Sequence, residues 1–298
     1  MTTSVSAPWM VSLHGGHSSA YCDHADSTLQ ELLDAAVERG MRVFGMTEHA
    51  PRGEKRLLFP EEVSMGWDVR KIGRMFEEYA QESRERVAEY ADRIQLLRGF
   101  EIEVAPGRRY PELMQKLRER HQFDYIVGSV HFVEDELFDY NVESLKKVSQ
   151  KVGGLEKLGV RYYRILAEMV EALRPEVVGH MDVIRKYAEP LGAVDTPPIR
   201  EAAMEALEAV RAAGAILDVN TAPYRRGHDV PYPAPWIVEA ARDMGIPFCF
   251  GDDSHAVADV GAGIEQARAY LLDHQVDAIT CLMRRDDGAI DREVIPLQ

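Results

Sequence analysis

Short apolar runs alternate with amphipathic segments along most of the chain. Each run is typical of a buried strand, and polar residues stand where the runs end. These residues are His14, His49, Glu101 or Glu103, His131, His180, Asn220 and His255. The segments between the runs carry apolar residues at helical spacing, so we predict seven strand–helix units.

Caps mark the boundaries of the predicted helices. Ser27 and Thr28 open one helix, with Gln30 and Glu31 placed for a capping box, and Gly40 ends it. Apolar side chains recur at helical spacing over residues 155–173, which predicts a long helix there. A further helix is predicted over residues 195–214, because a threonine and two prolines open it and a glycine closes it.

The repeated units predict one parallel sheet, since parallel neighbours need helical crossovers. Seven units without a Gly/Ser-rich linker favour a closed or nearly closed barrel in a single domain over residues 1–298. An open, doubly wound sheet is the alternative. The two longest connections, residues 51–67 and 223–236, are rich in proline, glycine and charge, and loops of this length usually serve function.

The composition narrows the class of protein. Hydrophobic residues make up 46% of the 298 positions, and no apolar run approaches the roughly 20 residues that span a bilayer. The opening "MTTSVSAPWM" has neither the basic nor the apolar region of a signal peptide, so we expect a cytoplasmic protein without a membrane partner. A net charge of −15 argues against nucleic-acid binding but permits a small anionic substrate where cations gather locally.

The chain has three cysteines: Cys22, Cys249 and Cys281. Their odd number and the lack of CxxC spacing predict neither a disulfide framework nor a thiolate zinc site. Cys249 stands in the apolar stretch "IPFCF", and we expect it to be buried.

The polar residues at the strand ends predict a metal centre. In a β/α barrel the carboxyl ends of all strands open on one face, where active sites are built. His14 or His17 would meet there with His49, Glu101, His131, His180, Asp253 and His255. Imidazoles and carboxylates without thiolates suit Zn²⁺, Fe²⁺ or Mn²⁺, and this many ligands exceeds what one ion uses. We therefore expect two or three divalent transition-metal ions.

Seven motifs between about His14 and Gly263 occur in a characteristic order. They are "HSSAYCDHA", "TEHAPR", "GFEIE", "GSVHF", "GHMD", "VNTAPYRR" and "GDDSHAVADVG". This ordered set resembles the polymerase and histidinol phosphatase superfamily, and within it the histidinol-phosphate phosphatases. The resemblance implies an α/β fold, a distorted (β/α)7 TIM-like barrel, with a trinuclear metal centre at its mouth.

The resemblance also implies a ligand set, carried over residue by residue. The matching positions are His17, His24, His49, Glu101, His131, His180, Asp253 and His255. The first motif departs from the family's usual His-x-His, because Gly15 holds the first position and His14 precedes it. Two flexible glycines allow a bulge that returns His14 to the site, so His14 is included among the expected ligands.

The activity that the resemblance implies is hydrolysis of L-histidinol phosphate, in histidine biosynthesis, by attack of a metal-bridging hydroxide. Arg225 matches the family's phosphate-contacting arginine, with Arg226 beside it, and Arg52 and Lys186 match basic positions near the mouth. Either Asp253 or a metal-bound water would protonate the leaving group.

Two other functions stay open at this point. A relative of the phosphatases would hydrolyse another phosphomonoester or a phosphodiester. A non-catalytic metal-binding module is the third hypothesis, although no polymerase region accompanies the ligand set. The expected partner is a small phosphorylated substrate, and the sequence leaves room for a homo-oligomer.

Overall fold

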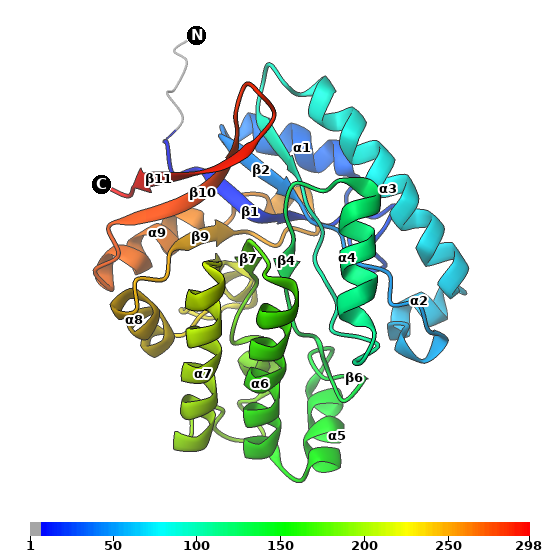
Figure 1. Cartoon of the computed structure of the whole chain (residues 1–298), viewed down its shortest axis with the longest axis vertical. Coiled ribbons are helices and arrows are strands. Elements are labelled where there is room, and N and C mark those ends of the chain that lie inside the picture. Colours follow the sequence, from blue (N-terminus) through cyan, green and yellow to red (C-terminus); the bar gives the residue numbers. More distant parts are fainter. Residues whose placement is uncertain (1–6) are drawn as a thin grey trace.

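A seven-stranded parallel sheet forms the centre of the molecule (Figure 1) in the computed structural model, which describes residues 7–298. Its strands are β1 (Val11–Gly16), β2 (Val43–Met46), β3 (Gln95–Arg98), β4 (Val127–Gly128), β7 (Val177–Val178), β8 (Ile216–Asn220) and β9 (Phe248–Gly251). They run in the order β3-β2-β1-β9-β8-β7-β4. Residues 1–6, on which much of the signal-peptide prediction rests, lie outside the described residues.

The sheet curls round so that its two edge strands meet. A parallel bridge joins Glu101, just beyond β3, to Val127 in β4. Val127 N donates to Phe100 O at 3.0 Å, and Ile102 N donates to Val127 O at 2.9 Å. The predicted distorted (β/α)7 barrel is therefore confirmed, and the open doubly wound sheet is wrong.

Helices surround the sheet and connect its strands. They are α1 (Leu29–Glu38), α2 (Pro60–Ser64), α3 (Val69–Glu89), α4 (Tyr110–His121), α5 (Val142–Val152), α6 (Leu155–Leu173), α7 (Pro197–Ala213), α8 (Pro235–Asp243) and α9 (Ile264–Asp273). The predicted capping box opens α1: the Thr28 side chain accepts from Glu31 N, and the Glu31 carboxylate accepts from Thr28 N at 2.8 Å. The helices predicted over 155–173 and 195–214 are α6 and α7, which lie side by side in Figure 1.

Two antiparallel hairpins lie outside the predicted pattern. β5 (Phe132–Val133) and β6 (Glu136–Leu137) follow His131 at the barrel mouth. β10 (Ala278–Arg284) pairs with β11 (Ile290–Pro296). The "AITCLMR" of β10 has the apolar character of another barrel strand, but its partner is β11 and not the central sheet.

The β10–β11 hairpin covers the end of the barrel opposite the strand ends discussed above. Gln95, the first residue of β3, exchanges two hydrogen bonds with Arg284 of β10, at 2.9 and 3.0 Å. Arg42, just before β2, binds Glu293 of β11 through two contacts of 2.8 and 2.9 Å. Among residues 7–298, the structure contains no helix with the length and apolarity to cross a membrane.

Candidate metal centre

The first strand contains an irregularity that places His14. Ser12 pairs with Phe44 and Gly16 with Met46, so β1 uses two more residues than β2 over the same stretch. A Cβ at Gly15 would lie 2.2 Å from the carbonyl oxygen of Gly45, which excludes any larger residue without a backbone shift. The glycines therefore permit the bulge that the sequence suggested.

The bulge brings both early histidines into the same cluster. His14 is fully buried, and its Nδ1 lies 3.0 Å from Asp218 Oδ2 while its Nε2 lies 3.4 Å from Glu101 Oε1. His17 is also fully buried, with Nε2 3.4 Å from Asp253 Oδ1. The position of His14 agrees with the expected bulge, and its role as a ligand stays a prediction.

Glu101 lies at the centre of the cluster. Five imidazole nitrogens approach its carboxylate: those of His49 at 2.8 Å, His180 at 3.0 Å, His14 at 3.4 Å, His131 at 3.5 Å and His17 at 3.8 Å. Burial alone would raise the pKa of this carboxyl, but the surrounding imidazoles hold the pKa of Glu101 well below its usual range. A buried, ionised carboxylate amid several imidazoles is suited to bridge two cations.

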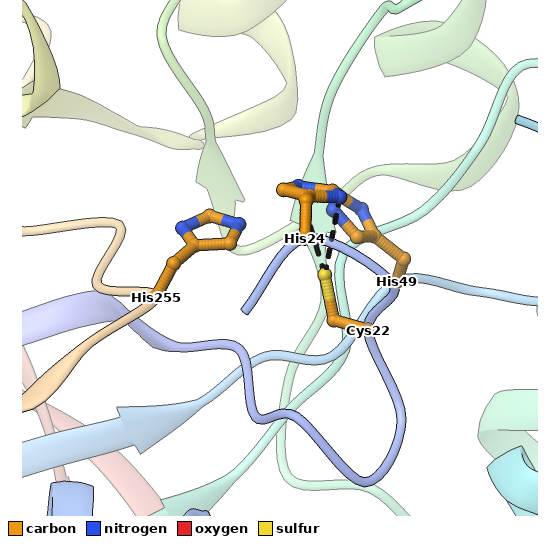
Figure 2. Close-up of side chains that lie close together, drawn as sticks. All are labelled: Cys22, His24, His49 and His255. Carbon is orange, nitrogen blue, oxygen red and sulfur yellow. Dashed lines mark hydrogen bonds between the residues drawn. The ribbon is translucent and has the colours of Figure 1, made fainter. Parts of the chain in front are cut away.

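A second group lies at the outer side of the cluster (Figure 2). Its members are Cys22, His24, His49 and His255, whose ligand atoms all lie within 4.8 Å of one another. The ring of His255 stacks on His17 with centroids 4.5 Å apart and on His24 at 4.7 Å. Burial raises the pKa of the Cys22 thiol well above its usual value, and nearby Glu48 adds to the effect.

Buried ring nitrogens without hydrogen bonds test whether the cluster fits metal ions. Within the described part of the chain they include His14 Nε2, both nitrogens of His17, His180 Nδ1 and His255 Nε2. Buried polar atoms are nearly always paired in proteins, so a group of unpaired ring nitrogens beside buried carboxylates requires an explanation. Divalent ions supply one, since imidazole and carboxylate suit Zn²⁺, Fe²⁺ and Mn²⁺. The nine residues predicted as ligands fit such ions.

Some buried residues of the site were not among the predicted ligands. Glu103, the alternative to Glu101 at its strand end, lies 3.2 Å from His131 Nδ1 and 3.6 Å from His49 Nδ1. Asp218 holds His14, and Asn220 Nδ2 donates to Asp218 Oδ2 at 3.1 Å. A charged residue inside the apolar run "AILDVNT" was the available signal for Asp218, because an ionised side chain in a buried strand needs a partner.

A cavity of about 390 Å³ opens beside the cluster, and three of the four predicted basic residues line it. Arg225 donates from Nη1 to Asp252 O at 2.6 Å and from Nη2 to Asp253 O at 2.8 Å. Lys186 Nζ lies 3.1 Å from Asp139 Oδ2, and Arg226 Nη1 donates to Tyr187 OH at 3.2 Å. The cavity wall therefore carries cations next to the buried cluster.

The fourth basic residue, Arg52, is placed differently. Its side chain is buried, forms an ion pair with Glu62, and lies 3.6 Å from Glu103. The guanidinium stacks on Phe59, 3.7 Å from the ring centroid. Phe59 lines the cavity and Arg52 does not. The substrate contact expected of Arg52 stays a prediction, and the contacts present are with carboxylates.

Comparison of the sequence with known proteins shows the family of this chain. Residues 14–222 match the model of the PHP domain. The chain belongs to the PHP domain family. The "probable histidinol-phosphatase" of Schizosaccharomyces pombe is 30% identical over 277 residues, which cover 91% of this chain and 89% of that protein.

Two solved PHP-type structures share the fold. The putative histidinol phosphatase of Listeria monocytogenes superposes with a TM-score of 0.75 at 23% identity, covering 86% of this chain and 99% of that one. The histidinol phosphate phosphatase of Lactococcus lactis, solved with zinc, L-histidinol and phosphate, gives a TM-score of 0.68 at 19% identity and covers 94% and 99%. At these identities the likeness supports the fold alone.

Proposed function

We propose that this PHP domain protein is a metal-dependent phosphomonoesterase that hydrolyses L-histidinol phosphate to L-histidinol and phosphate, in histidine biosynthesis. The observation that carries the proposal is the ring of orphaned, buried imidazole nitrogens around Glu101, next to a cavity lined by cations. The name of the fission yeast relative supports the same activity, as do the ligands bound to the Lactococcus protein.

We assign metal binding to the nine predicted ligands: His14, His17, His24, His49, Glu101, His131, His180, Asp253 and His255. Bound divalent ions would supply hydroxide near neutral pH and neutralise phosphoryl oxygens. Burial alone raises the pKa of Asp253, but His14, His17 and His255 hold that pKa well below its usual range. An ionised Asp253 can bind a cation but cannot donate a proton, which favours its role as a ligand over that of proton donor to the leaving group.

Arg225 is the proposed phosphate-binding residue. Two of its nitrogens are fixed by the carbonyl oxygens of Asp252 and Asp253, and Asp259 lies 3.3 Å from its Nε. These contacts hold the guanidinium beside Asp253 at the edge of the cluster, where a phosphoryl group would meet it. Arg226 and Lys186 supply further positive charge to the same cavity.

The cavity also offers a place for the ammonium group of an amino alcohol. Three cavity carboxylates lie outside the metal cluster, and two of them have cationic partners: Asp139 pairs with Lys186, and Asp259 with Arg225. Glu61 of α2 forms no ion pair within residues 7–298 and accepts a hydrogen bond from the Tyr140 hydroxyl. We propose that Glu61 binds the substrate ammonium, which would distinguish histidinol phosphate from a neutral phosphate ester.

Phosphate release tests the proposed function. L-Histidinol phosphate, an aryl phosphate and an aryl phosphodiester are compared with wild type, Arg225→Ala and the exposed control Arg292→Ala. We expect histidinol phosphate to have the highest kcat/KM of the three substrates. Arg225→Ala should lower this kcat/KM on the order of 10²-fold, which corresponds to about 3 kcal/mol of lost transition-state stabilisation, as for a lost oxyanion donor. Arg292→Ala should resemble wild type. Faster turnover of the diester would favour the phosphodiesterase alternative, and no turnover by metal-loaded protein would favour a non-catalytic module.

Glu61→Gln separates the amine contact from the phosphate contact. The substitution keeps the shape of the side chain and removes its charge. We expect KM for histidinol phosphate to rise roughly fivefold, as for a partly exposed ion pair of about 1 kcal/mol. KM for the aryl phosphate, which has no ammonium group, should stay unchanged. An equal rise for both substrates would contradict the assignment.

A further inference from the structure

The thiol of Cys22 points into the outer group of histidines. Cys22 is 3% exposed, and its backbone N donates to Ser18 O at 2.8 Å, which fixes the loop that carries it. Its Sγ lies 3.4 Å from Nδ1 and 3.6 Å from Nε2 of His24. Figure 2 shows the sulfur directed toward the His24 ring, with His49 and His255 on either side.

The separation of Cys22 and His24 matches the dimensions of one coordination sphere. A zinc ion lies about 2.3 Å from a cysteine sulfur and about 2.0–2.1 Å from an imidazole nitrogen. At a tetrahedral angle the sulfur and nitrogen are then about 3.5 Å apart, and the observed Cys22–His24 separations fall on either side of that value. The ligand atoms of His49 and His255 complete the four, all within 4.8 Å of one another.

A second observation points to a missing occupant at this place. His255 Nε2 is buried and makes no hydrogen bond within the described residues. A thiol serving only as a hydrogen-bond donor to His24 would leave this nitrogen unexplained. A cation bound by all four side chains satisfies it.

We propose that Cys22 is a metal ligand, which completes a tetrahedral site with His24, His49 and His255. The inference rests on the proposed metal binding and adds a sulfur ligand to it. When a divalent ion binds, the S–H bond breaks, the sulfur keeps the electron pair and forms the bond to the metal, and the proton leaves to solvent. A thiolate ligand favours Zn²⁺, Co²⁺ or Cd²⁺ over Mn²⁺, so this position selects a softer ion than a site of imidazoles and carboxylates.

Cobalt substitution tests the proposal independently of activity. Metal-free protein is loaded with Co²⁺, and its absorption spectrum is recorded for wild type, Cys22→Ser and the control Cys281→Ala, in which a buried thiol of the far hairpin is removed. We expect a sulfur-to-cobalt charge-transfer band in the near ultraviolet in wild type and in Cys281→Ala, and no such band in Cys22→Ser. The affinity for one ion should fall roughly tenfold or more in Cys22→Ser.

Each outcome decides the question. Wild-type protein that binds cobalt without the sulfur band would overturn the thiolate ligand but leave the proposed metal centre and function intact. Wild-type protein that binds no cobalt would overturn both. Because the wild-type spectrum alone gives this answer, the test holds even where Cys22→Ser fails to fold. A preference for Zn²⁺ over Mn²⁺ at one position in wild type, lost in Cys22→Ser, would support the proposal further.

Discussion

The two ends of the barrel bury opposite kinds of side chain. The mouth encloses imidazoles and carboxylates, among them His14, His17 and Glu101, all nearly inaccessible to solvent. The far end, covered by β10 and β11, buries apolar residues such as Ile279 and Ile295. Burying ionisable groups costs free energy unless partners compensate, whereas burying apolar surface stabilises the fold. One end therefore supports chemistry and the other supports stability, as in other β/α barrels.

The largest expected effect, on kcat and on metal content, comes from changing Glu101 at the centre of the metal cluster. Glu101→Gln removes the charge that five imidazoles surround, so the ions would lose their shared ligand. We expect kcat to fall by on the order of 10³-fold, at least the cost of a lost oxyanion donor, together with loss of bound metal. Elemental analysis and phosphate release measure the two effects, and circular dichroism checks that the variant is folded. Near-normal kcat would refute the central role of Glu101.

The next effect concerns the far end and stability alone. Ile295→Ala removes a buried side chain of β11 and should lower the free energy of unfolding by about 2–5 kcal/mol. Its neighbour Val294, 67% exposed, provides the matched control, because Val294→Ala should change stability little. Chemical denaturation measures stability, and kcat at 25 °C should be unchanged in both variants. Loss of kcat in folded Ile295→Ala would mean that the two ends are coupled.

A smaller effect, on metal affinity, is expected from Asp218, which contacts the predicted ligand His14. Asp218 Oδ2 lies 3.0 Å from His14 Nδ1, and this contact fixes the ring so that Nε2 faces Glu101. Asp218→Asn keeps the shape but removes the charge that supports this orientation. We expect a 10- to 100-fold loss of metal affinity, as for other carboxylates behind metal-binding histidines. Asp273→Asn, an exposed change in α9, is the control, and titration with a metal-sensitive dye measures both. Equal affinities would assign Asp218 a purely structural role.

The smallest expected effect is the dependence of metal affinity on pH. Burial lowers the pKa of His131, but Glu103, Glu101 and Asp139 outweigh it and raise the pKa to about 10. In metal-free protein His131 is therefore protonated at neutral pH, and a bound ion must displace that proton. Metal affinity should rise about tenfold per pH unit for each released proton, and the contribution of His131 should level off near pH 10. Calorimetry in buffers of different ionisation enthalpy counts the protons, and a pH-independent affinity would contradict this.

Unlike metal affinity, the stability of metal-free protein should fall as pH rises. The raised pKa of His131 contributes stability that is fully present below the ordinary value of 6.5 and is lost as pH rises through about 10. Denaturation of metal-free His131→Gln should therefore show a weaker pH dependence in this range than wild type.

The sequence predicted the barrel because each strand and helix carries its own periodicity and caps. It predicted where most of the candidate ligands lie because strand ends converge in such a barrel, whereas His24 followed only from the family resemblance. The β10–β11 hairpin was not predictable in the same way, since an apolar strand does not specify its partner. The position of Arg52 also depends on tertiary packing: its sequence motif places it near the mouth, but Phe59 and Glu62 hold it beneath the cavity wall.

The pairing of β1 with β9 has a consequence for biosynthesis of the chain. His14 lies opposite Gly251 in the sheet, and Ser12 Oγ donates to Asp252 Oδ1 at 3.0 Å across 240 positions of sequence. At translation rates of about 5–20 residues per second, roughly 10–50 s separate the emergence of these partners from the ribosome. During that time a nascent chain displays its early histidines without Asp253 and His255. Only a chain that extends past His255 can then assemble the full set of predicted ligands, so tight metal retention would distinguish such chains from those terminated earlier.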